Sequence, residues 1–65
     1  MSAAEDFEDA RVRWREAERD VQAAAPGWPS IEPGVPIDIN RLGEALARSA
    51  RAERDMLVAL RANIA

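Results

Sequence analysis

The four prolines of this 65-residue chain all lie between Pro26 and Pro36, which leaves a proline-free stretch on either side. Proline lacks a backbone N–H and disfavours the helical conformation in the residue before it, so a continuous α-helix should end near residue 25. Both flanking stretches are rich in Ala, Arg and Glu, which favour helices. The sequence therefore predicts helices at about residues 3–25 and 39–63, joined by a proline-rich connector at 26–37.

Both predicted helices begin at residues suited to capping. Ser2 followed by Glu5 fits the capping box, in which each side chain satisfies a free backbone N–H of the first turn. Asp38 is a good N-cap for the second helix. Gly27 can supply the left-handed turn that commonly follows a helix end. These residues predict helix starts at 3 and 39.

The first helix carries one apolar stripe. Its members alternate at spacings of three and four residues, a heptad pattern typical of a helix packed on one other helix. We predict that this stripe forms one half of a hairpin core; its members are Phe7, Ala10, Trp14, Ala17, Val21 and Ala24.

The second helix carries two apolar stripes side by side. The first contains the larger residues, with one polar member: Ile39, Gly43, Leu46, Ala50, Glu53, Leu57, Leu60 and Ile64. The second contains smaller residues: Leu42, Ala45, Ser49, Ala52, Met56, Ala59 and Asn63. One partner helix covers only one stripe. We expect the larger residues, among them Leu46, Ala50, Leu57 and Leu60, to pack on the first helix, and the smaller ones to contact a partner.

The predicted fold is an all-α antiparallel hairpin, with residues 1–65 forming a single domain. If the connector folds symmetrically, Trp14 should lie beside Ser49 and Ala50, to within one helical turn. The second apolar stripe favours association into a four-helix bundle or packing on a larger assembly.

Two residues leave alternatives open. Trp28, in the connector, either folds back over the end of the helix pair, which we favour, or is an exposed anchor for a partner, since Trp is enriched at binding hot spots. Glu53 either lies at the edge of its stripe and pairs with a neighbour such as Arg11, or is a buried charge that sets register or partner choice.

The composition argues against catalysis. The chain has no Cys and no His, so it lacks disulfides, thiolate metal sites and the commonest general base at neutral pH. Its carboxylates at helical spacing are typical of a solvated helix face. We expect no enzyme activity, no cofactor, no bound metal and no small-molecule substrate.

The charge pattern disfavours nucleic acid as a partner. The formal net charge is −3, whereas nucleic-acid-binding domains are usually basic. The alternative is a small dimeric regulator that uses a row of exposed arginines on the first helix, Arg11, Arg15 and Arg19. An acidic N-terminal segment and the lack of about 18 consecutive apolar residues predict a cytoplasmic protein, or one within a virion assembled there.

The small size of the chain favours association. A chain this short buries only about 60% of the surface that its unfolded form exposes, and here neither disulfides nor a metal compensate. We therefore expect a non-catalytic interaction or structural subunit that binds itself or a larger protein assembly. A phage virion component is one specific form of this hypothesis.

Overall fold

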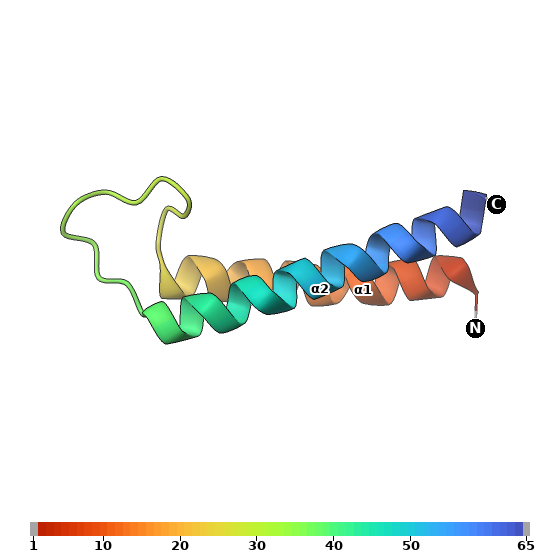
Figure 1. The fold of residues 1–65 in the computed structure, drawn as a ribbon, viewed down its shortest axis with the longest axis horizontal. Helices are drawn as coiled ribbons and strands as arrows, with labels where there is room; N and C mark the ends of the chain where they lie inside the picture. The colour runs from red at the N-terminus through yellow and green to blue at the C-terminus, as the bar shows by residue number, and fades with distance from the viewer. Residues whose placement is uncertain (1, 65) are drawn as a thin grey trace.

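The computed structural model of the chain describes residues 2–64, apart from the side chain of Asn63. Within that range it contains two helices and no strand, α1 at Ala3–Ala24 and α2 at Ile39–Ile64. The helices lie side by side and antiparallel in a rod with dimensions of 47 × 17 × 13 Å (Figure 1). The prediction of an all-α helical hairpin is therefore confirmed. No helix in the described part combines the length and the apolar character needed to cross a membrane.

Both helices start at the predicted capping residues. The Ser2 Oγ accepts a hydrogen bond from the Glu5 N–H at 3.2 Å, and the Asp38 Oδ1 accepts one from the Arg41 N–H at 3.0 Å. Each bond satisfies one backbone donor that the first helical turn leaves free. α1 ends at Ala24, one residue earlier than predicted, and Gly27 then adopts a positive φ of 90°.

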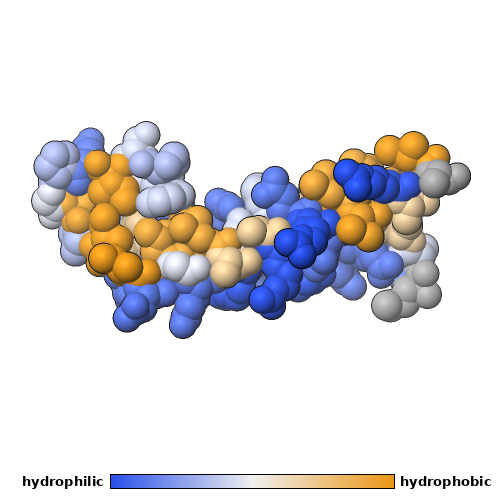
Figure 2. All heavy atoms as spheres, viewed as in Figure 1, coloured by the Kyte–Doolittle hydropathy of each residue, from blue (hydrophilic) through white to orange (hydrophobic). Residues whose placement is uncertain are grey.

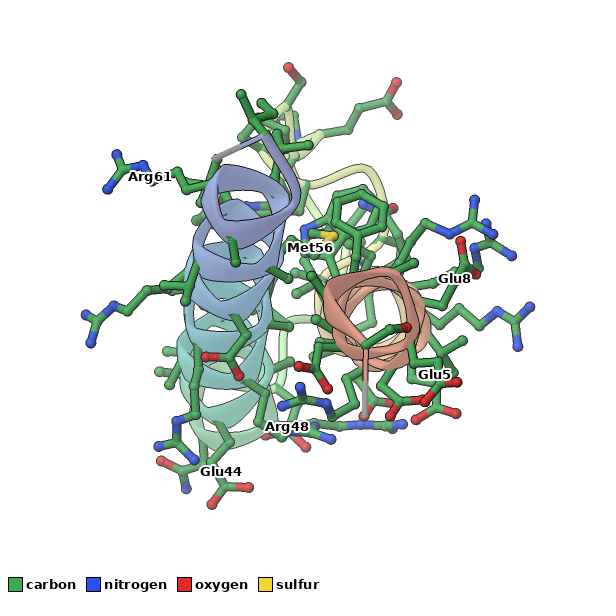
Figure 3. The ribbon with its side chains drawn as sticks, turned by 90° about the vertical axis from the view of Figure 1, so that its right-hand side faces the viewer. Glu5, Glu8, Glu44, Arg48, Met56 and Arg61 are labelled. Carbon is green, nitrogen blue, oxygen red and sulfur yellow. The ribbon has the colours of Figure 1, made fainter. Side chains whose placement is uncertain are left out.

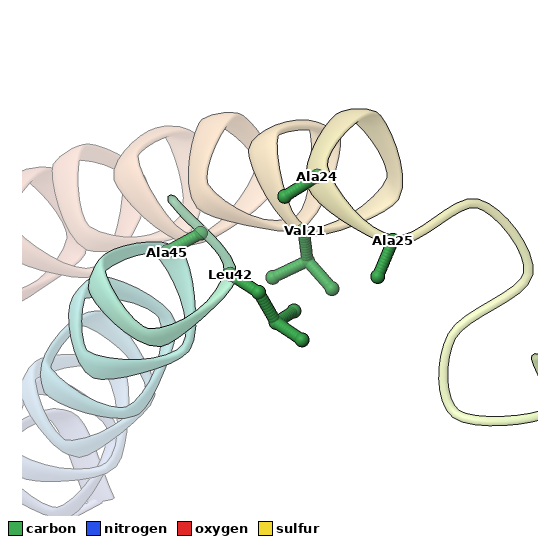
Figure 4. Packing of buried hydrophobic residues seen from close by; sticks show 5 residues of the cluster. All are labelled: Val21, Ala24, Ala25, Leu42 and Ala45. Carbon is green, nitrogen blue, oxygen red and sulfur yellow. The ribbon is translucent and has the colours of Figure 1, made fainter. Parts of the chain in front are cut away.

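The contact between the helices is made mostly by small side chains. Buried residues at the interface are, on the α1 side, Ala10, Ala17, Val21, Ala24 and Ala25, and on α2, Leu42, Ala45, Ser49, Ala52 and Ala59. Five of them, Val21, Ala24, Ala25, Leu42 and Ala45, form a cluster at the connector end (Figure 4). Because the distance between helix axes depends on side-chain size, an alanine-rich seam lets the two backbones approach closely.

The stripe of α2 that packs on α1 is not the one that the sequence predicted. The described members of the smaller-residue stripe face α1, and this stripe is called the inner stripe below. The larger-residue stripe, called the outer stripe, lies beside that contact, and most of its residues are exposed. Of the four outer-stripe residues that we expected in the hairpin core, Leu46 is half-buried against the cluster, whereas Ala50, Leu57 and Leu60 are exposed. The reason is fit: α1 presents Ala10 and Ala17 at its centre, and a row of leucines opposite would hold the backbones apart.

The side chain of Gln22 joins the connector to the end of α1 through two hydrogen bonds. Gln22 Nε2 donates to the Trp28 carbonyl, and Gln22 Oε1 accepts from the Gly27 N–H, both at 3.1 Å. Ile31 packs on the buried cluster, while Trp28 stays 37% exposed. Ile31 therefore covers this end of the hairpin, and Trp28, the residue favoured for that place, is partly exposed.

Candidate interaction surface

One side of the hairpin is polar and carries ion pairs between the helices. Arg13 binds Asp55 at 3.0 Å, and Arg48 binds Asp20 at 2.7 Å, with Arg41 at 3.5 Å from the same carboxylate. The hydrogen bond from Arg48 lowers the pKa of Asp20 below its ordinary value of 3.8, and Arg41 adds to the effect. These pairs are partly exposed, so they help to set the helix register more than they stabilise the fold.

The opposite side of the hairpin is apolar. Helical periodicity places the half-buried Phe7 and Trp14 on the flank of α1 away from Arg13 and Asp20. Met56 and Arg48 lie on opposite sides of the plane that contains the two helices (Figure 3). The hairpin therefore has one face fastened by ion pairs and one face lined by large apolar side chains.

The outer stripe of α2 continues this apolar face into solvent. Ile39 and Ile64 are each 77% exposed, Leu57 is 49% exposed and Leu60 is 42% exposed. The apolar surface gathers toward the two ends of the rod, with a hydrophilic band between them (Figure 2). Single exposed apolar residues such as Ile39 are ordinary on a protein surface, but a group of three on one stripe near the end of a helix, Leu57, Leu60 and Ile64, is a candidate interaction site.

The middle of the outer stripe is small and polar. Ala50 and Glu53 are both exposed, and Glu53 lies at the surface rather than in the helix seam. Gly43 is exposed as well, and a Cβ added there would meet nothing within 4 Å. Arg11, the partner that the sequence suggested for Glu53, instead binds Glu8 at 3.1 Å.

Most residues that the sequence assigned to a partner interface lie inside the hairpin. The Ser49 Oγ donates to the Glu18 Oε1 at 2.6 Å, across the helix seam. Met56 is half-buried, Trp28 is the one member that is exposed, and the others are buried between α1 and α2: Leu42, Ala45, Ser49, Ala52 and Ala59. The surface that the sequence reasoning missed is the outer stripe, and the signal that could have revealed it is the alanine at every second position of the α1 stripe.

The arginine row of α1 is exposed and interrupted. Arg11, Arg15 and Arg19 all lie at the surface, and the ion pair with Glu8 offsets the charge of Arg11. The row therefore presents less positive charge than its three guanidinium groups alone would suggest.

A shallow hollow lies at the open end of the hairpin. It has a volume of about 410 Å³ and is lined by acidic residues, an ion pair and apolar side chains, namely Ala3, Asp6, Asp9, Arg13, Asp55, Val58, Ala59 and Ala62. Arg13 already neutralises Asp55 there. Among the residues that the structure describes, no three acidic side chains are placed to hold a metal ion.

Comparison with known proteins adds no relative. No family model, no curated protein and no solved structure matches this chain.

Proposed function

We propose that this chain is a non-catalytic structural subunit that associates with a second copy of itself through the outer stripe of α2. The observation that carries the proposal is the position of the large aliphatic side chains. Ile39, Leu57 and Ile64 stand in solvent, while alanines fill the seam between the helices.

The buried seam of the hairpin contains few large apolar side chains. Burial of apolar surface is worth about 25 cal/mol per Å², so an alanine contributes much less than a leucine or an isoleucine. The only large side chain that is fully buried in the hairpin is that of Val21, among the described residues. Association that covers the outer stripe would supply the burial that the hairpin core does not.

The shape of the apolar face suits a four-helix bundle. The half-buried Phe7 and Trp14 of α1 lie on the same side of the hairpin as the half-buried Leu46 of α2. Two hairpins that faced each other on this side would enclose both sets of side chains and leave the ion pairs of Asp20 at the surface.

Sedimentation equilibrium of the purified chain and of two matched variants tests the proposal. Leu57→Arg places a charge on the outer stripe, and Val58→Arg makes the same change at a neighbouring residue that is 60% exposed and off the stripe. We expect a dimer or larger oligomer for the natural chain and for Val58→Arg, and a helical monomer for Leu57→Arg. A natural chain that stays monomeric up to its solubility limit would contradict the proposal.

Salt dependence separates this proposal from binding to nucleic acid. Association through apolar side chains should persist or strengthen as salt rises. A complex with duplex DNA that is lost steeply as salt rises would instead point to phosphate contacts, with the Arg11, Arg15 and Arg19 row as their source.

A further inference from the structure

We infer that two copies pair antiparallel through α2, with the two-fold axis beside Ala50 and Glu53, and with Leu60 of each copy seated over Gly43 of the other. This inference rests on the proposed self-association and specifies its geometry. It follows from the glycine, the order of residues along the outer stripe, and the acidic residue at its centre.

Gly43 has no role inside the hairpin. It lies within α2, where glycine is a poor helix former compared with alanine. Its φ is not positive, and a Cβ at this position would meet nothing within 4 Å, so neither the backbone nor the packing of this chain requires a glycine. The close approach of a side chain from outside would account for it.

The order of residues along the outer stripe supplies that side chain. In an antiparallel pair the first stripe residue of one helix faces the last of the other. This register leaves no member of the stripe without a partner, and it pairs Ile39 with Ile64, Gly43 with Leu60, Leu46 with Leu57, and Ala50 with Glu53. A shift of one heptad in either direction leaves residues at one end of each stripe uncovered.

The apolar surface visible on one face of the rod is compatible with this arrangement. Its two apolar regions lie toward the ends of the rod, on either side of the hydrophilic band (Figure 2). Rotation by 180° about an axis through that band brings the connector end of one copy onto the open end of the other. Apolar surface then meets apolar surface at both ends.

Glu53 selects this orientation against the parallel one. A parallel pair would place the two Glu53 carboxylates directly opposite each other in the seam, where like charges repel with little water to screen them. In the antiparallel pair the two Glu53 residues lie on either side of the two-fold axis, offset along the helices by about 4.5 Å, and each faces Ala50 of the other copy. The alanine is small, so the carboxylate can turn past it and reach solvent.

Cysteine cross-linking tests the orientation directly, because the chain has no cysteine of its own. Leu46→Cys and Leu57→Cys variants, mixed and mildly oxidised, should form a disulfide-linked heterodimer, whereas neither variant alone should cross-link well. The control is Val58→Cys mixed with Leu46→Cys, which should remain unlinked. Efficient cross-linking of Leu57→Cys with itself would overturn the antiparallel arrangement while leaving self-association intact. A natural chain that sediments as a monomer would defeat both proposals.

Substitution of Gly43 tests the close contact. Gly43→Leu should raise the dimer Kd by at least about tenfold, because the added side chain occupies the space assigned to Leu60. The control is Glu44→Leu, at an exposed position on the Arg48 side of α2 (Figure 3), which should leave the Kd unchanged. Circular dichroism checks that both variants keep their helices. A Gly43→Leu dimer as tight as that of the natural chain would overturn the proposed register.

Discussion

The inner and outer stripes of α2 run along the same helix and differ mainly in side-chain size. The inner stripe, rich in alanine, is largely buried against α1, and the outer stripe, with its leucines and isoleucines, is largely exposed. A stable contact between helices has two separate requirements. Close backbone approach needs small side chains, whereas a large transfer free energy needs large ones. In this hairpin the inner stripe meets the first requirement, and the outer stripe could meet the second only if a partner covered it.

The largest expected effect comes from the one leucine of the inner stripe. Leu42 is buried in the cluster at the connector end, so Leu42→Ala should lower the free energy of unfolding by about 2–5 kcal/mol. Leu57→Ala, on the outer stripe, should change it by about 0.5 kcal/mol or less in the monomer. Urea unfolding followed by circular dichroism, at concentrations where the chain is monomeric, measures both. Equal losses of unfolding free energy in the two variants would mean that Leu42 and Leu57 contribute equally to the hairpin.

Enlarging an alanine should have the next largest effect. Ala45 is fully buried, so Ala45→Leu should force the helices apart and cost about 1–3 kcal/mol. Ala50→Leu adds the same atoms at an exposed position of the outer stripe and should be nearly neutral in the monomer. Thermal unfolding compares the two variants. An Ala45→Leu variant as stable as the natural chain would show that the seam is not closely packed.

The polar member of the inner stripe should contribute less. Ser49→Ala removes the hydrogen bond to Glu18 and should cost about 1 kcal/mol, because the bond has a charged acceptor but alanine is the better helix former. Glu18→Gln keeps an acceptor at the same place and should lose less. Chemical denaturation of both variants measures the difference, and a Ser49→Ala variant more stable than the natural chain would contradict it.

The smallest effect concerns Asp20 on the ion-paired side. Its pKa is lowered in the folded chain, chiefly by Arg48, so its ionised form stabilises the fold above the ordinary value of 3.8 and this contribution is lost as the pH falls through the lowered pKa. Asp20→Asn should therefore be slightly less stable than the natural chain at neutral pH. This difference in stability between the two chains should disappear below about pH 4, as melting curves at several pH values would show. A gap that stays constant with pH would exclude this linkage.

The helix boundaries could be predicted because they depend on neighbouring residues. Ser2, Asp38 and Pro26 each act within one turn of the chain, and the observed helices begin at the predicted residues. Local signals of this kind need no knowledge of what lies across the fold.

The choice between the two stripes could not be predicted in the same way. Both stripes have helical periodicity, and the decision depends on how each fits the surface of α1. Side-chain size within α2 alone favours the outer stripe as the one that packs on α1, whereas the buried alanines of α1 require small side chains opposite. The observed register lies within the one turn allowed, since Ser49 bonds to Glu18, four residues after Trp14. The connector sets this offset, and its path depends on Gln22 and Ile31.

The start of α1 and the end of α2 lie together at one end of the rod, with the connector at the other (Figure 1). In the proposed antiparallel dimer each tip would therefore carry the chain ends of one copy and the connector of the other. Such a particle has two equivalent tips, so it can bridge two identical neighbours but gives the assembly no polarity of its own.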